Sequence, residues 1–253
     1  MAILAAIITK VGRSGQYVLA TFLGFLRRPC VRASEAAVPV PKPILLLWLL
    51  AFAFGVTAMF GLLALPLIVV SEVAVGENLK QVLDRSALSV LVALIVLGPL
   101  VEEIIFRGWL TGTYQAMGGA ALFLGIFYGA ATVLEGTGSE TVRLVAQLGV
   151  SSLAFLVFVV IERSGTPTRP GGYEALFPYL FWLQGLTFGA LHFANLAGSS
   201  IALPFLMAAP LVICGWLFAY ARVVAGFGSA WLLHALYNIP PAAGAILLPL
   251  LSR

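Results

Sequence analysis

Long runs of apolar residues, separated by short polar segments, dominate the chain. The first clear run, residues 44–70, contains no charged residue. Similar runs follow at residues 86–108, 118–134, 142–161, 175–195, 201–220 and 227–250. A helix needs about 20 apolar residues to cross a bilayer, and each run approaches or exceeds that length. The pattern therefore predicts an all-α fold, a polytopic transmembrane helix bundle of about seven spans.

The first 43 residues depart from this pattern. Residues 1–28 are apolar but are interrupted by Lys10 and Arg13, and a pair of arginines ends the segment. Such a mixture predicts an amphipathic helix that lies on the membrane surface. Residues 32–43 are rich in proline and valine and cannot be helical throughout, which indicates a linker. We therefore divide the chain into a membrane-surface segment with its linker, residues 1–43, and a transmembrane domain, residues 44–253.

Composition agrees with a membrane protein. Hydrophobic residues make up 61% of the chain and charged residues only 9%, which no ordinary soluble domain matches. The net charge of +4 is spread over loops, so nucleic acid is not an expected partner, whereas the lipid bilayer is. A cytoplasmic N-terminus places most basic residues on the cytoplasmic side, as the positive-inside rule requires. Because arginine outnumbers lysine, we expect a bacterial source and a bacterial cytoplasmic membrane.

Two adjacent carboxylates and a guanidinium, Glu102, Glu103 and Arg107, interrupt the second apolar run. Ionisable groups within a span are costly and indicate function by default. On a helix, Glu103 and Arg107 share a face in the order that favours an ion pair, and Glu102 points roughly 100° away, available for chemistry. The preceding Gly98-Pro99 removes one backbone hydrogen bond and permits a kink that admits water. The alternative is that both glutamates are ordinary charges at a helix end.

Both histidines of the chain also fall within predicted spans. His192 lies four residues after Phe188, and His234 lies four residues before Asn238, so each pair shares a helical face. A single histidine in an apolar helix is more often a satisfied core residue than a catalyst. Two histidines, an asparagine and two carboxylates in spans otherwise poor in polar groups need partners, and they best find one another.

This set of side chains suits hydrolysis. A carboxylate and an imidazole can hold one water between them, and the carboxylate takes its proton as general base. His234 and Asn238 can donate to the oxygen that becomes negative in a tetrahedral intermediate. The two cysteines, Cys30 and Cys214, are far apart and form no metal motif, and no serine or cysteine stands beside a base at a suitable spacing.

In their order along the chain, the polar motifs resemble those of the CPBP family of intramembrane proteases. That family includes the CAAX prenyl endopeptidases and the bacteriocin-processing and abortive-infection-like membrane proteins. The motifs that carry the resemblance are Glu102-Glu103-x-x-x-Arg107, Phe188-x-x-x-His192 and His234-x-x-x-Asn238.

The resemblance implies a role for each motif residue. Glu102 and His192 correspond to the pair that activates water. His234 and Asn238 correspond to the pair that forms the oxyanion site. The supporting acid and base are Glu103 and Arg107. The family has been described both as metal-dependent and as metal-free, and we favour a metal-free glutamic protease without cofactors, because good ligands are few.

We therefore expect an endopeptidase that cleaves a membrane-associated protein or peptide. A prenylated C-terminus, a bacteriocin leader and the tail of a surface protein are open as substrates, although a bacterial source argues against prenyl processing. One alternative is a proton-coupled transporter that uses Glu102, His192 and His234 as a relay. A second is an immunity or binding protein without catalysis. The sequence leaves the oligomeric state open.

Overall fold

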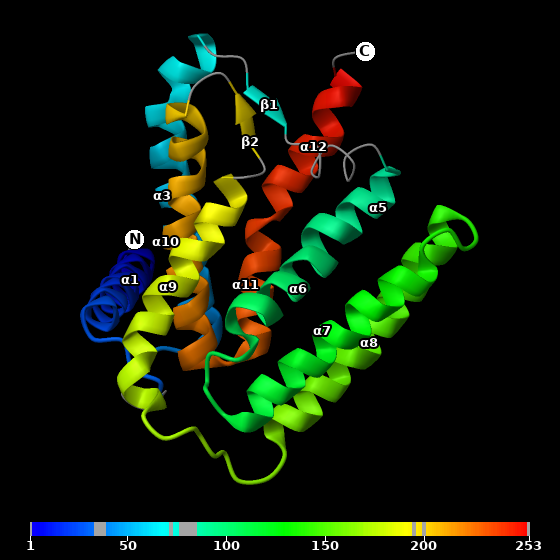
Figure 1. Ribbon diagram of the computed structural model, residues 1–253. Helices are drawn as coiled ribbons and strands as arrows, with labels where there is room; N and C mark the ends of the chain where they lie inside the picture. The colour runs from blue at the N-terminus through cyan, green and yellow to red at the C-terminus, as the bar shows by residue number, and fades with distance from the viewer. Residues whose placement is uncertain are drawn as a thin grey trace. The chain divides into compact units, whose positions relative to one another are not determined.

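The computed structural model describes residues 2–32, 39–70, 73–75, 85–193, 196–198 and 201–251, and most of this chain is helical (Figure 1). The helical elements are α1 (Ala2–Arg27), α3 (Lys42–Val70), α5 (Ala87–Leu91), η1 (Val92–Leu97), α6 (Gly98–Glu103), η2 (Ile104–Gly108), α7 (Tyr114–Leu134), α8 (Glu140–Arg163), α9 (Tyr173–Phe193), α10 (Ala202–Ala225), α11 (Phe227–Tyr237) and α12 (Ile239–Leu251). Two short strands, β1 (Val73–Val75) and β2 (Leu196–Gly198), form a two-stranded sheet that the sequence pattern did not predict.

Within the described residues, five helical segments are long and apolar enough to cross a membrane. They are Lys42–Leu67, Ala87–Gly108, Tyr114–Leu134, Glu140–Arg163 and Ala202–Ala225. The prediction of a polytopic, all-α membrane protein is therefore confirmed, but the count of about seven spans is not. Helix α9 has the length of a span, but polar residues such as Gln184 and Thr187 lower its apolar character.

The last predicted span, residues 227–250, is divided between two helices. Asn238 separates α11 from α12, which are 11 and 13 residues long, and both are shorter than a span requires. The N–H of Asn238 donates to the carbonyl of His234 at 3.0 Å and so closes the last turn of α11. Pro240 and Pro241 follow and have no N–H to extend the hydrogen bonds of that helix. Hydropathy alone therefore predicted one span where the structure has two helices, which the prolines separate.

The described chain forms two compact units. The first unit comprises Met1–Ala74 and Glu174–Leu233, and helices α3 and α10 pack along each other within it. Helices α9 and α10 also approach closely, because Gly215 and Gly185 meet without intervening side chains. The indole N–H of Trp216 on α10 donates to the carbonyl of Trp182 on α9 at 3.2 Å.

Helix α1 belongs to the first unit and presents one apolar face to it. Phe22 and Phe25 are buried, and their rings lie 5.4 Å and 5.1 Å from the ring of Tyr220 on α10. The Phe25 ring also contacts Phe181 of α9 edge-on at 5.1 Å. One face of the helix is therefore buried against its own unit, and its predicted amphipathic character stays a prediction, since Tyr17, Leu19 and Leu23 are exposed. Its location on the membrane surface and the division of the chain at residue 43 stay predictions, and half of the predicted linker, residues 33–38, lies outside the described residues.

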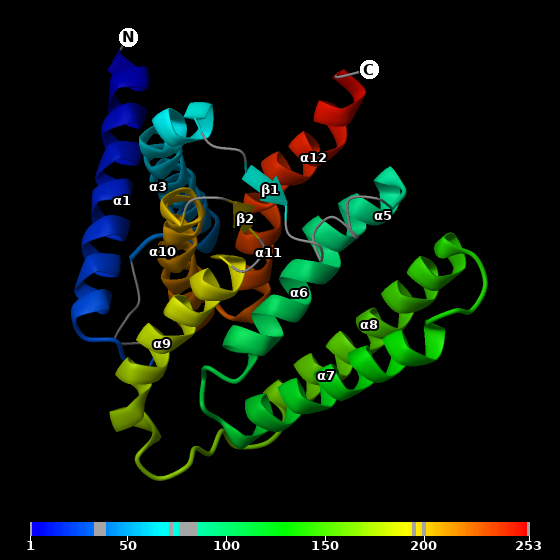
Figure 2. The same cartoon turned by 45° about the horizontal axis from the view of Figure 1, so that its top comes forward.

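The second unit comprises Val75–Tyr173 and His234–Arg253. Helices α7 and α8 form an antiparallel hairpin that both views show side by side (Figures 1 and 2). The hairpin is tight because Gly119 of α7 faces Phe158 of α8 without a side chain of its own. Helix α12 packs against α5 and η1, so the end of the chain contacts the helix that carries the two glutamates.

The turn after η2 is anchored by Tyr173, which ends the first segment of this unit. The Tyr173 hydroxyl donates to the carbonyl of Leu110 at 3.1 Å, and its ring occupies the space where a side chain on Gly112 would lie. Gly112 has a φ of +70°, a conformation that glycine adopts without strain. This turn fixes the C-terminal end of the glutamate-bearing helix.

Candidate active site

The helix that carries Glu102 and Glu103 contains two π-helical segments, η1 before the glutamates and η2 after them. The N–H of Gly98 donates to the carbonyl of Ala93, five residues earlier, and Pro99 has no N–H to donate. The break predicted at Gly98-Pro99 therefore takes the form of a wider helical turn. π-helical turns of this kind are frequent at functional sites.

Gly98 is the residue that permits this wider turn. A Cβ atom at position 98 would lie 2.7 Å from the Ala93 carbonyl oxygen, closer than side chains approach. We expect Gly98→Ala to lower the free energy of unfolding by about 1–3 kcal/mol through this overlap, measured by thermal unfolding in detergent. Gly125→Ala on α7 is the control, because its Cβ would meet no atom within 4 Å. A Gly98→Ala protein as stable as the control would contradict the π-helical register.

Glu103, Arg107 and His234 form a buried cluster within the second unit. The carboxylate of Glu103 pairs with the guanidinium of Arg107 one turn later, and both side chains are completely buried. The Nδ1 atom of His234 lies 2.9 Å from the same carboxylate oxygen, and its side chain is 3% exposed. The predicted Glu103–Arg107 pair is present, and the histidine is an additional partner. A buried ion pair needs hydrogen-bond partners of this kind, because a buried charge without partners is costly.

Glu102 lies on the other side of the same imidazole. Its Oε2 atom is 3.7 Å from Nε2 of His234, and its side chain is 32% exposed. Because Nδ1–H donates to ionised Glu103, Nε2 is the ring atom directed toward Glu102. At 3.7 Å the two atoms are too far apart for a direct hydrogen bond. One water could contact both.

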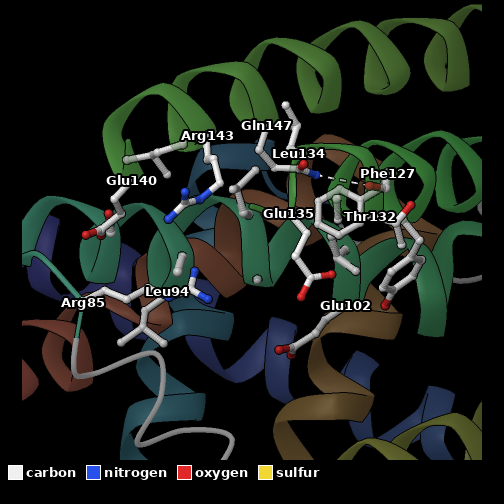
Figure 3. Close-up of a pocket in the computed structure, with 18 of the residues that line it drawn as sticks. Arg85, Leu94, Glu102, Phe127, Thr132, Leu134, Glu135, Glu140, Arg143 and Gln147 are labelled. Carbon is white, nitrogen blue, oxygen red and sulfur yellow. Dashed lines mark hydrogen bonds between the residues drawn. The ribbon is translucent and has the colours of Figure 1, made fainter. Parts of the chain in front are cut away.

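Glu102 also lines a cavity of about 940 Å³ within the second unit (Figure 3). The close-up shows Glu102 reaching into the cavity, with Glu135 and Arg143 on the wall formed by the α7–α8 hairpin. The remaining wall is mainly apolar and includes Leu94 and Phe127. A partly exposed carboxylate beside a buried imidazole thus opens onto a space large enough for several residues of a peptide.

Asn238 lies at the junction of α11 and α12. Its side-chain Nδ2 donates to the backbone carbonyl of Leu94 at 2.9 Å. One of its two amide hydrogens is therefore committed to the π-helical segment η1. Its predicted role in the oxyanion site, which depends on the other hydrogen, stays a prediction.

His192 belongs to the first unit, at the end of α9. Its Nδ1 atom lies 2.8 Å from the carbonyl of Phe188, and the two rings are 4.5 Å apart. Because a carbonyl only accepts, Nδ1 carries the hydrogen that it donates to this carbonyl. The predicted Phe188–His192 pair is present. Its partnership with Glu102 stays a prediction.

Sequence reasoning did not single out the Leu94 carbonyl or Glu135. The sequence did contain a signal for the Leu94 carbonyl, because Pro99 has no N–H to donate to a carbonyl of the preceding turn. Glu135 had no such signal, since nothing in the sequence places the end of α7 beside Glu102. In the described part of the chain, no three His, Cys, Asp or Glu side chains are arranged to hold a metal ion. The residues of this cluster do not fit a metal centre, because Glu103 is occupied by Arg107 and His234.

Comparison with known proteins identifies the region that contains the two glutamates. Residues 84–168 match the family model described as type II CAAX prenyl endopeptidase, Rce1-like. The matched stretch includes Glu102, Glu103 and Arg107 and continues through α7 and α8, whereas both histidines lie beyond it. No curated protein and no solved structure matches the chain. Over residues 84–168, about a third of the chain, the protein is therefore similar to the Rce1-like type II CAAX prenyl endopeptidases.

Proposed function

We propose that the protein is an endopeptidase that hydrolyses a peptide bond of a membrane-associated protein or peptide with a water molecule activated by Glu102. The observation that carries the proposal is the position of Glu102 between a cavity and the buried His234–Glu103–Arg107 cluster. Ionisable groups within a membrane span are costly and indicate function by default. A transmembrane site at which a carboxylate meets both a substrate-sized space and an oriented imidazole fits peptide hydrolysis.

In the proposed reaction, Glu102 takes a proton from water as the oxygen of that water attacks the peptide carbonyl carbon. A C–O bond forms, and the carbonyl oxygen becomes negative in the tetrahedral intermediate. Nε2–H of protonated His234 donates a hydrogen bond to that oxygen. The C–N bond then breaks, the proton held by Glu102 passes to the departing amine, and the carboxylate is restored.

Glu103 and Arg107 fix the imidazole of His234 in the orientation that this reaction needs. The hydrogen bond from Nδ1 to Glu103 holds the ring so that Nε2 faces Glu102. The resemblance adds His192 as the partner of Glu102 in activating water. For Asn238 the resemblance implies a second donor to the oxyanion, but the contact of its side-chain nitrogen with the Leu94 carbonyl also allows a positioning role, and the two roles make different predictions.

The cavity suits an extended peptide with apolar side chains. Its apolar wall can contact the apolar part of a substrate segment near a membrane face. Its charged residues, which include Arg143 and Glu140, can contact the polar part. A prenylated C-terminus, a bacteriocin leader and a surface-protein tail each combine an apolar and a polar part. The distribution of basic residues supports a cytoplasmic N-terminus in a bacterial cytoplasmic membrane.

Reconstitution into proteoliposomes separates the protease from the transporter. We expect the purified protein to cleave peptides drawn from the host membrane proteome and to carry no proton flux under an imposed pH gradient. Both readouts are collected from one preparation by mass spectrometry and an enclosed pH dye. Proton flux without cleavage would support the relay of Glu102, His192 and His234 instead. Neither activity, with tight binding of a membrane partner, would support an immunity protein.

Chelation tests the metal-free form of the mechanism. Because Glu102 acts directly on water, we expect incubation with EDTA or phenanthroline, followed by their removal, to leave the cleavage rate within about twofold of the untreated enzyme. A required metal would be released and turnover lost with it. Restoration of lost activity by added Zn²⁺ would contradict the metal-free proposal while retaining the protease.

A further inference from the structure

The Asn238 side chain reaches across the second unit to a main-chain group of the glutamate-bearing helix. Its amide nitrogen donates to the carbonyl oxygen of Leu94 at 2.9 Å, across 144 positions of sequence. Leu94 lies within η1 and lines the same cavity as Glu102. Asn238 is not among the described residues that line that cavity. The contact joins the α11–α12 junction to the turn that precedes the glutamates.

The Leu94 carbonyl needs a donor from outside its helix because of the two residues that follow the turn. In an α-helical register its donor would be the N–H of Gly98, but that N–H donates to Ala93 instead. In a π-helical register its donor would be the residue five positions on, which is Pro99 and has no N–H. A carbonyl without a partner in an apolar span is costly. The Asn238 amide supplies the missing hydrogen.

We propose that Asn238 is a positioning residue that holds the π-helical turn of η1 and, through it, the orientation of Glu102. This role rests on the proposed function of Glu102. An α-helix advances by roughly 100° per residue, so loss of the extra residue in the turn would rotate all that follows by about that angle. Glu102 would leave the cavity wall, and Glu103 would turn away from His234. The amide hydrogen bond stabilises the register in which both contacts exist.

Pro99 provides the test, because alanine at that position restores a main-chain N–H. In Pro99→Ala, the Leu94 carbonyl has a main-chain donor in either register: the restored N–H at position 99 in a π-helical turn, or that of Gly98 in an α-helical one. Asn238→Leu keeps the size of the side chain and removes its donor. We expect Asn238→Leu to lower kcat on the order of tenfold with an unchanged KM when Pro99 is present, and by less than about twofold in the Pro99→Ala background. Asn238→Gln tests whether a longer donor can restore the contact.

The two roles of Asn238 give opposite results in this cycle. A donor to the oxyanion acts on the substrate, so its loss would lower kcat equally in the wild-type and Pro99→Ala backgrounds, and this result would overturn the proposal. An unchanged kcat in Asn238→Leu would overturn it as well. If Pro99→Ala lowers activity by itself, the comparison can be made with melting temperatures instead. The four proteins are the wild type, Asn238→Leu, Pro99→Ala and the double variant. The melting temperature should fall for Asn238→Leu in the wild-type background and change little in the Pro99→Ala background, and equal falls would overturn the proposal.

Failure of the proposed function is distinguishable from failure of this inference. If Glu102→Gln cleaves peptides like the wild type, the protease mechanism is wrong, whereas the melting temperatures still report whether Asn238 compensates for Pro99. If Glu102→Gln is inactive and the Pro99 cycle shows no coupling, the mechanism stands and the positioning role of Asn238 does not.

Discussion

Glu102→Gln is expected to lower the rate of peptide cleavage by about 10²–10⁴-fold, the usual contribution of a general base. Glutamine has nearly the same shape as glutamate and can still contact water and the rim of the cavity. It cannot accept the proton that water loses when it attacks. The loss should therefore appear in kcat, and the melting temperature should stay near that of the wild type, because Glu102 is partly exposed and Glu103 carries the buried pair.

The measurement compares fragments released from the host membrane proteome by wild-type and variant proteins in equal folded amounts. Glu174→Gln is the matched control, because Glu174 pairs with Arg32 on the surface of the first unit, with side chains 51% and 56% exposed. It should cleave like the wild type. His192→Ala should be as inactive as Glu102→Gln if the two share the activation of water. Wild-type rates in Glu102→Gln would refute the assignment of the general base.

The first polar motif was predictable because helical spacing is a local property. Residues four apart share a face in any helix, so the Glu103–Arg107 pair followed from the sequence. The third partner of that pair did not, because His234 is 131 positions from Glu103 and only packing brings the two side chains together. The sequence predicted that Glu103 pairs with Arg107 and that His234 contacts the substrate. This prediction is incomplete, since His234 also binds Glu103.

The span count shows the corresponding limit for the fold. Hydropathy reports the apolar character of a run but not whether its backbone is continuous, so residues 227–250 were predicted as one span. Pro240 and Pro241 carry the information that separates α11 from α12. The Gly98-Pro99 break was correctly located. Its form, a π-helical turn, depends on a donor from the α11–α12 junction that the sequence alone does not place.

Arg107→Met is expected to lower the free energy of unfolding by about 3–5 kcal/mol, because it leaves a buried carboxylate without its main counter-charge. Glu103 would retain the hydrogen bond from His234. The measurement is reversible unfolding in mixed micelles, followed by circular dichroism. Arg32→Met is the control, since it removes an arginine from the exposed pair with Glu174 and should cost less than about 1 kcal/mol.

The double variant Glu103→Met/Arg107→Met separates stability from orientation. With both charges removed and apolar side chains in their place, we expect the free energy of unfolding to rise above that of Arg107→Met but to stay about 1–3 kcal/mol below the wild type, because the buried Nδ1–H of His234 loses its acceptor. Cleavage should not return, because Nδ1 of His234 loses the carboxylate that directs Nε2 toward Glu102. Recovery of both properties would show that the pair serves packing alone. Partial recovery of stability without cleavage requires that the buried pair act on the reaction through the imidazole between the two glutamates.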